Sequence, residues 1–158
     1  MSSVATQTFC SDLPELCGMG VEALGRAYRT GILSPVEVTL AALDRAEAIQ
    51  PALNAFTRID REGALTAARA SGARWRAGRP LSEIDGVPTT LKDIVWVAGW
   101  PVRYGSATTP DTPMETDAPA VARLRAAGAV FIGQTTTPEF GWKAVTDSPA
   151  FGITRNPW

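Results

Sequence analysis

The sequence predicts an α/β fold, because patterns typical of helices and of strands alternate along its 158 residues. The clearest unit covers 117–132, where a helical pattern, a glycine turn and the apolar run 129–132 follow one another. With 45% hydrophobic residues, a chain of this length can bury one sizeable core. We therefore expect helices layered on a sheet.

Residues 1–33 are expected to form an N-terminal arm, with a first helix that begins near Asp12 or Gly20. Within this arm, residues 18–23 (GMGVEA) match the loose form of a dinucleotide-binding fingerprint. That motif needs a buried strand directly before it. The preceding letters, SDLPELC, do not have a strand pattern. A loop leading into a helix is the favoured interpretation, and nucleotide binding is a weak alternative.

A clear helix is predicted over 34–49. Ser34, Pro35 and Glu37 have the arrangement of a capping box, with serine at the N-cap, proline at the first helical position and glutamate at the third. Apolar residues and alanines then recur at helical spacing. Pro51 is expected to end this helix.

The middle of the chain alternates strand, helix and strand. Residues 53–59 (LNAFTRI) alternate as a strand does, and 61–76 predicts a helix closed by a glycine, with its arginines on a solvated face. After a turn that contains glycine and proline, residues 89–91 predict a short strand that enters the core. The segment 99–116 is expected to be a long loop, and loops of that length are usually functional or act as covers.

The last third of the chain contains one more predicted helix and one more strand. Thr116 or Asp117 is expected to cap the helix, whose first turn contains Pro119. The apolar run 129–132 then predicts a buried strand, and 137–139 could open another short helix. The residues beyond are expected to be loops.

Composition excludes several classes of function. The formal net charge of −1 provides no basic surface, so nucleic acid is not an expected partner. No apolar run approaches the roughly 20 residues of a membrane span, and the first residues lack the features of a secretory signal. Two cysteines, Cys10 and Cys17, imply no disulfide framework, which favours a cytoplasmic location.

The chain contains no histidine, which narrows the chemistry further. A Ser-His-Asp triad, a Cys-His dyad and a His-based zinc site are excluded within these residues. Any general base must therefore be a carboxylate, a lysine, a tyrosine or a cysteine.

Lys92 is the best candidate for that base, because it lies between the strand 89–91 and the apolar run 94–97. If the strand enters the core, burial of the ammonium lowers the pKa of the lysine, which can then act as a base near neutral pH. The alternative is a lysine at a strand end whose ammonium reaches water. The neighbouring Asp93 could be an ion-pair partner, a turn former or an orienting group, and these interpretations stay open.

Four blocks of the sequence resemble motifs of the amidase signature family, in the family's order. Residues 85–93 (DGVPTTLKD) resemble its G-[IV]-P-x-x-[LVI]-K-D strand, and 117–130 (DAPAVARLRAAGAV) resemble its helix–strand stretch. Residues 133–140 (GQTTTPEF) resemble its G-K-T-[NT]-x-x-E-[FW] motif. Residues 148–158 resemble the run that leads into the signature itself. Four ordered blocks are much more specific than any single one.

The resemblance implies a mixed central sheet layered by helices and a Ser–cis-Ser–Lys triad, with Lys92 as the catalytic lysine. In such a triad the lysine acts through the bridging serine as base and then as acid, while the nucleophilic serine forms an acyl-enzyme. Backbone amides of a Gly/Ser-rich loop would hold the oxyanion. The family implies hydrolysis of the C–N bond of small-molecule carboxylic amides, without a cofactor and often by a homo-oligomer.

The chain departs from the family pattern in two places. The Gly/Ser-rich signature with both serines should begin directly after Trp158, and Ser106 and Ser148 lie in loops without that context. Residues 34–158 are therefore expected to be the N-terminal part of an incomplete, truncated amidase domain that is inactive alone. Gln134 stands where the family usually has lysine, which we interpret as a structural difference. A non-catalytic α/β module that binds a partner is the alternative, and the substrate-binding residues are not predicted.

Overall fold

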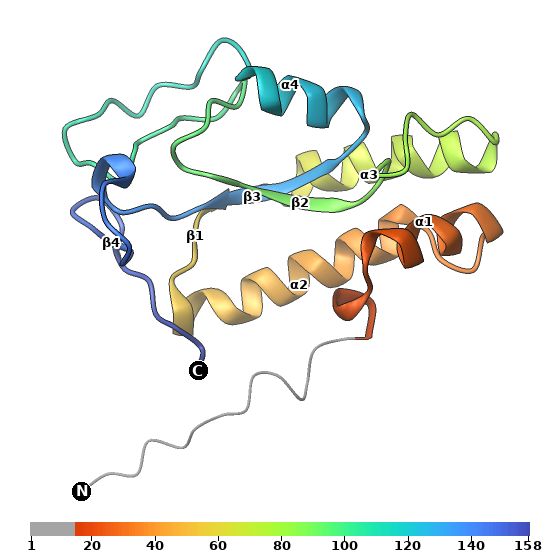
Figure 1. The fold of residues 1–158 in the computed structure, drawn as a ribbon, viewed down its shortest axis with the longest axis horizontal. Helices are drawn as coiled ribbons and strands as arrows, with labels where there is room; N and C mark the ends of the chain where they lie inside the picture. The colour runs from red at the N-terminus through yellow and green to blue at the C-terminus, as the bar shows by residue number, and fades with distance from the viewer. Residues whose placement is uncertain (1–14) are drawn as a thin grey trace, which may run out of the picture.

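The computed structural model describes residues 15–158, which fold into helices on both faces of a small sheet (Figure 1). The three main strands have the order β1–β3–β2, with β3 antiparallel to β1 and parallel to β2. The predicted α/β class with a mixed sheet is therefore confirmed. The elements in chain order are η1 (Glu15–Gly18), α1 (Val21–Thr30), α2 (Pro35–Leu53), β1 (Phe56–Ile59), α3 (Arg61–Arg76), β2 (Pro88–Lys92), α4 (Pro119–Ala126), β3 (Val130–Thr135), η2 (Glu139–Gly141), β4 (Asp147–Ser148) and β5 (Gly152–Ile153).

Two apolar clusters cover the two faces of the central strand β3. On one face, α2 and α3 pack against alternate residues of β3; on the other, α4 and the segment after β2 do so (Figure 1). The buried residues of the first cluster are Leu43, Ala64, Ala68, Val130 and Ile132. Those of the second are Leu91, Val97, Trp100, Val121, Ala129 and Phe131. The period-two alternation of a strand thus divides the core into two layers.

Helix α1 adds a third cluster at the start of β2. Leu24 and Tyr28 of α1 are buried against Val38, Trp75 and Val87, which belong to α2, α3 and the turn before β2. The helix begins directly after Gly20, in agreement with one of the two predicted starts, whereas Asp12 lies outside the described residues. The division of the chain at residue 33 stays a prediction.

Helix α2 begins as predicted but ends later. The capping box is present, because the Glu37 amide donates to Ser34 Oγ at 3.2 Å and the Ser34 amide donates to Glu37 Oε2 at 2.8 Å. The prediction that Pro51 ends the helix is wrong, since the helix continues to Leu53. The last turn persists because the Gln50 side chain receives hydrogen bonds from the two amides that follow Asn54.

The arginines of α3 do not all lie on a solvated face. The bounds of α3 agree with the predicted 61–76, and Arg61 pairs with Asp44 and Glu47 at the surface. Arg74, in contrast, pairs with the fully buried Asp85, so the prediction is wrong for this residue. A buried carboxylate requires such a partner.

The predicted N-cap of α4 is also wrong. Ala118 occupies the N-cap without a side-chain hydrogen bond, and Pro119 stands in the first turn as expected. The carboxylate of Asp117 is engaged elsewhere: it accepts the Ala98 amide at 2.7 Å and pairs with Arg125. Asp117 therefore fastens the long segment after β2 to the far end of α4.

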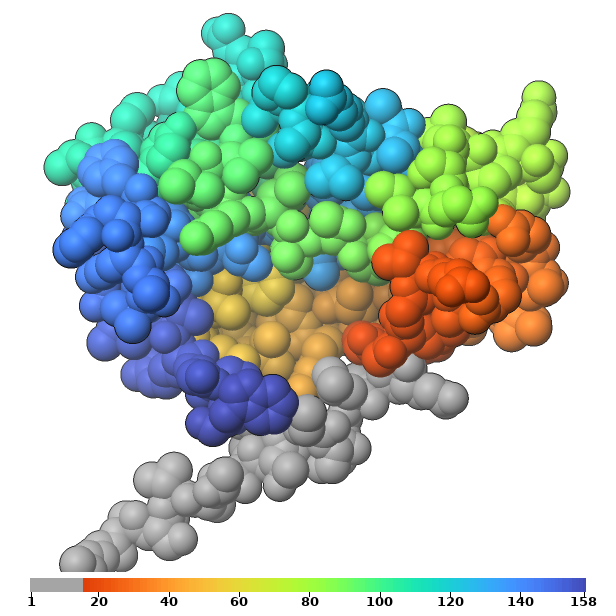
Figure 2. Space-filling view, in the orientation of Figure 1, coloured from red at the N-terminus to blue at the C-terminus, as the bar shows by residue number. Residues whose placement is uncertain are grey.

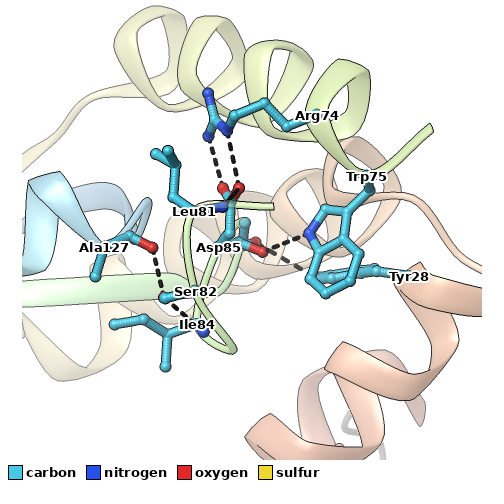
Figure 3. Close-up of polar contacts among 9 residues, drawn as sticks. Tyr28, Arg74, Trp75, Leu81, Ser82, Ile84, Asp85 and Ala127 are labelled. Carbon is cyan, nitrogen blue, oxygen red and sulfur yellow. Dashed lines mark hydrogen bonds and ion pairs between the residues drawn. The ribbon is translucent and has the colours of Figure 1, made fainter. Parts of the chain in front are cut away.

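The turn that leads into β2 is organised around Asp85 (Figure 3). Its side chain accepts hydrogen bonds from Arg74 Nε at 2.8 Å, Arg74 Nη2 at 2.6 Å and the Leu81 amide at 2.9 Å. Its backbone carbonyl accepts from Trp75 Nε1 at 2.9 Å. Burial opposes ionisation of this carboxyl, but the hydrogen bonds from Arg74 and Leu81 prevail and hold its pKa below the usual range.

Two glycines allow this turn to close. Gly86 and Gly128 both have positive φ, +88° and +90°, a region that favours glycine. A Cβ on Gly128 would stand 2.7 Å from Cγ of Asp85, and one on Gly86 would stand 2.6 Å from Ser71 Oγ. Backbone of the α4–β3 turn therefore lies directly against the Asp85 carboxylate, and no side chain fits between them.

None of the helices within residues 15–158 combines the length and the apolar character that crossing a bilayer requires.

We predict that Gly128→Ala lowers the free energy of unfolding by about 3 kcal/mol, because the alanine adopts a strained φ and displaces a paired carboxylate. Urea denaturation of the purified chain measures the change. Gly78→Ala is the matched control, since Gly78 also has a positive φ, +67°, but has no atom within 4 Å of the added Cβ. It should cost only about 1 kcal/mol. Equal losses in the two variants would contradict the role given to the Asp85 contact.

We also predict that Asp85→Asn lowers the free energy of unfolding at pH 7 by about 2–3 kcal/mol, since it leaves Arg74 without its charge partner. The folded pKa of Asp85 is lowered, so its stabilising contribution is complete above the unfolded value of about 3.9 and is lost as pH falls through the folded value. The variant should therefore lose less stability than the parent on acidification below about pH 4.

Asp44→Asn is the control for this experiment, because Asp44 pairs with Arg61 at the exposed surface. Its removal should change the free energy of unfolding by less than about 1 kcal/mol. Urea titration at several pH values measures the free energy of unfolding of both variants. If Asp85→Asn lowers it no more than Asp44→Asn does, the buried Arg74–Asp85 pair stabilises the fold no more than a surface pair.

Candidate functional site

The predicted strand 89–91 is confirmed as part of β2, and Lys92 is the last residue of that strand. The parallel ladder places it opposite Thr135 of β3. The strand alternation turns Leu91 into the core beside Trp100, and Lys92 consequently points to the opposite face. Lys92 is one of only two lysines in the sequence.

The expectation that the strand carries Lys92 into apolar surroundings is wrong in this structure. Its side chain is exposed, like that of Thr90 two residues earlier, and no ion pair within residues 15–158 includes it. The physical reason is the position of β2 at the edge of the described sheet, where α2 and α3 cover β3 and leave the outer strand open. Figure 2 shows the residues around β2, in green, at the surface next to the amber atoms of α2.

Asp93 is buried and points away from Lys92 into the loop that follows. Its Oδ1 accepts the Arg103 amide at 2.8 Å, and its Oδ2 accepts the Gly105 amide at 3.0 Å. Burial raises the pKa of this carboxyl, and the two backbone hydrogen bonds oppose that rise. Of the three interpretations left open by the sequence, the structure supports the organiser of a turn, because Asp93 fixes the start of the loop 99–116.

The loop 99–116 is held in place at both ends. Bridges join Ala98 to Met114 and Pro101 to Pro113, which brings its two ends together. At its tip Ser106 donates to Glu139 Oε1 at 2.7 Å and so fastens the loop to η2. The loop is therefore held by its own two ends and by η2 rather than being an open connection.

The two serines weighed in the sequence analysis, Ser106 and Ser148, both form hydrogen bonds within the described residues. Ser106 is fully buried and binds Glu139, whereas Ser148 Oγ accepts the Phe151 amide at 3.0 Å. Neither hydroxyl is supported by a Gly/Ser-rich loop, in agreement with the sequence analysis. The structure thus offers neither of them as a nucleophile for Lys92.

The remaining candidates are not brought together into a site. Residues 15–18, which lead into the glycine-rich match and include its first glycine, form a 3-10 helix and not the strand that dinucleotide binding requires. Cys17 is a free thiol whose pKa is raised by burial, and Cys10 lies outside the described residues. Within residues 15–158 no three or more Cys, Asp or Glu side chains gather where they could hold a metal ion.

Comparisons with known proteins match most of the chain. The Amidase family model matches residues 37–158. A glutamyl-tRNA(Gln) amidotransferase subunit from Salinispora tropica is 40% identical over 146 residues, which cover 92% of this chain and 30% of that protein. The indoleacetamide hydrolase of Bradyrhizobium diazoefficiens is 42% identical over 132 residues, which cover 84% of this chain and 25% of that protein.

A solved structure agrees with these matches. The peptide amidase from Stenotrophomonas maltophilia superposes with a TM-score of 0.82 at 30% identity, over 90% of this chain and 31% of that one. The chain thus spans about a third or less of the length of the relatives it matches. It belongs to the amidase signature family and corresponds to the N-terminal portion of its members.

Proposed function

We propose that this chain is the lysine-bearing part of an amidase that hydrolyses carboxylic amides through a Ser–cis-Ser–Lys triad, with Lys92 as the triad's lysine. The observation that carries the proposal is the position of Lys92 at the end of β2, within the block 85–93. Two relatives, a peptide amidase and an indoleacetamide hydrolase, have names that specify amide hydrolysis. The substrate of this chain would be a small-molecule amide.

The chemistry needs groups that these 158 residues do not supply. A lysine acts as a base near neutral pH only when burial or a neighbouring charge favours its neutral form. Lys92 is exposed here, so we propose that polypeptide equivalent to the remaining length of the relatives covers it. The same polypeptide would contribute the paired serines and the oxyanion-binding amides.

In the proposed reaction, neutral Lys92 accepts a proton from the bridging serine, which accepts the proton of the nucleophilic serine as that serine attacks the amide carbon. The tetrahedral intermediate then breaks its C–N bond and releases ammonia or an amine, which receives the proton held by Lys92. Water hydrolyses the resulting ester by the same proton route. No step uses a cofactor.

A second candidate function is that of a non-catalytic module that binds a partner. The exposed apolar surface near the C-terminal residues favours it. Trp142 is 76% exposed and Trp158 is 84% exposed, which is unusual for such large apolar side chains. A hollow of about 460 Å³ with a mainly apolar lining lies between α2 and Trp158. One relative is named as part of a larger enzyme, which also favours assembly. A homo-oligomer and a cytoplasmic location remain proposals.

We predict that Lys92→Met abolishes amidase activity in a hybrid in which residues 1–158 replace the matching part of the Bradyrhizobium diazoefficiens indoleacetamide hydrolase. Removal of the general base should lower kcat/KM for indoleacetamide by at least about 10³-fold. Lys143→Met, which removes the only other lysine of the chain, is the control and should retain activity. A folded Lys92→Met hybrid with activity within about tenfold of the control would rule out Lys92 as the triad's lysine.

We further predict that the isolated 158-residue chain does not hydrolyse amides, because a base without its nucleophile and oxyanion donors leaves out most of the rate enhancement. Ammonia release from indoleacetamide measures this directly. Light scattering on the same sample distinguishes the second candidate. Association into a defined oligomer would favour a partner-binding module, and a monomer with cooperative thermal unfolding would speak against it.

A further inference from the structure

Three aromatic rings gather near the end of the sheet at which Lys92 stands. They belong to Trp96, Tyr104 and Phe140, and we call them the aromatic platform. Trp96 follows the last residue of β2 by four positions, and Phe140 follows the last residue of β3 by five. These two segments therefore continue from the carboxyl ends of two parallel strands (Figure 1). Ligands of open α/β sheets bind at this end of the strands.

The backbone is strained at two of these rings. Tyr104 and Phe140 both have a φ of +53°, in a region that bulky side chains rarely adopt. The two residues are held together, because the Phe140 amide donates to the Tyr104 carbonyl at 2.7 Å. The next amide, that of Gly105, donates to Oδ2 of the buried Asp93 at 3.0 Å. Strain of this kind persists only where the surrounding structure enforces it, and it clusters at ligand-binding segments.

The platform leaves ring surface open to solvent. Tyr104 and Phe140 have ring centroids 6.2 Å apart and planes inclined by only 26°, so the two rings are offset and do not cover one another. Trp96 Nε1 donates to the Tyr104 hydroxyl at 2.6 Å, which joins the third ring to the pair. Phe140 is 55% exposed and Trp96 is 48% exposed. Within residues 15–158, cations of the chain lie over four other rings but over none of these three; the four belong to Trp75, Trp100, Phe131 and Trp142.

This geometry favours a flat, uncharged ligand. A further ring can continue an offset stack of nearly parallel rings, whereas a cage for a cation needs rings that face the cation from several sides. The charged residues near Phe140 in the chain already have partners. Glu139 accepts a hydrogen bond from the buried Ser106, and Lys143 pairs with Asp147. A charged ligand would therefore find no free counter-ion among them.

We propose that the aromatic platform binds a flat, uncharged aromatic group, which stacks on the open ring surface of Tyr104 and Phe140 beside Trp96. Binding of this group needs only the 158 residues of the chain. In the proposed amidase, the group is the aromatic substituent of the amide substrate, because the platform stands at the strand end that carries Lys92. This assignment of the substrate rests on the proposed function, whereas the binding site does not.

The test uses the 158-residue chain with benzyl alcohol and cyclohexylmethanol, which share their carbon skeleton and hydroxyl group but differ in flatness. Titration followed by NMR should show saturable shifts of the ring signals of Trp96, Tyr104 and Phe140 with benzyl alcohol. Cyclohexylmethanol should bind at least about fivefold more weakly. Absence of saturable shifts at these rings would overturn the site. Equal binding of cyclohexylmethanol, or tighter binding of tetramethylammonium, would overturn the flat, uncharged ligand.

Phe140→Gly removes one ring of the platform and should weaken the binding of benzyl alcohol at least about fivefold. Glycine adopts a positive φ without strain, so this variant should not lower the thermal midpoint, which also checks that it is folded. Trp158→Ala is the matched control, because it removes a more exposed aromatic ring at the apolar hollow beside α2 and should bind like the parent. Unchanged affinity in folded Phe140→Gly, or a loss in Trp158→Ala instead, would contradict the proposal. The titration of the unmodified chain provides the answer if Phe140→Gly does not fold.

The substrate assignment is tested in the hybrid with the Bradyrhizobium diazoefficiens hydrolase, with indoleacetamide and acetamide as substrates. Phe140→Gly should lower the ratio of kcat/KM for indoleacetamide to kcat/KM for acetamide at least about fivefold. An unchanged ratio in an active hybrid would overturn the assignment of the substrate. A hybrid that hydrolyses neither amide, while the chain still binds benzyl alcohol, would contradict the proposed function and not the binding site.

Discussion

The ion pair between Arg74 and the fully buried Asp85 fixes the place where β2 enters the sheet. A carboxylate without water must have hydrogen-bond donors on every side, and here they come from α3 and from the turn after it. The backbone at Gly128 approaches the same carboxylate, which ties the start of β3 to this point. The register of β2 against β3, and with it the position of Lys92, therefore depends on one buried charge.

The elements that are predicted well from sequence are those whose signals are local. The capping box at Ser34 and the bounds of α3 depend on residues within a few positions of one another. The predictions for Pro51 and Asp117 are wrong because their outcome depends on other contacts. Gln50 supports the turn around Pro51 through amides beyond the helix, and Asp117 binds Ala98 across the chain rather than capping α4.

The candidate site shows the same division between local and distant information. The block around Lys92 predicts the strand to which it belongs. The exposure of the Lys92 side chain, however, depends on which strand lies at the edge of the sheet, and the order of the strands cannot be predicted from a local sequence pattern. The role of Asp93 depends on amides ten and twelve positions later in the chain.

The open side of β2 has a consequence for handling the protein. Within residues 15–158 this strand pairs only with β3, so its outer row of amides and carbonyls has no partner strand in the sheet. An unprotected row of this kind recruits strands from other molecules and leads to aggregation. A charged lysine at the strand end is one of the devices that discourage such recruitment. Lys92 would thus act as a gatekeeper against misassembly during folding, before any burial of its ammonium makes it useful as a base.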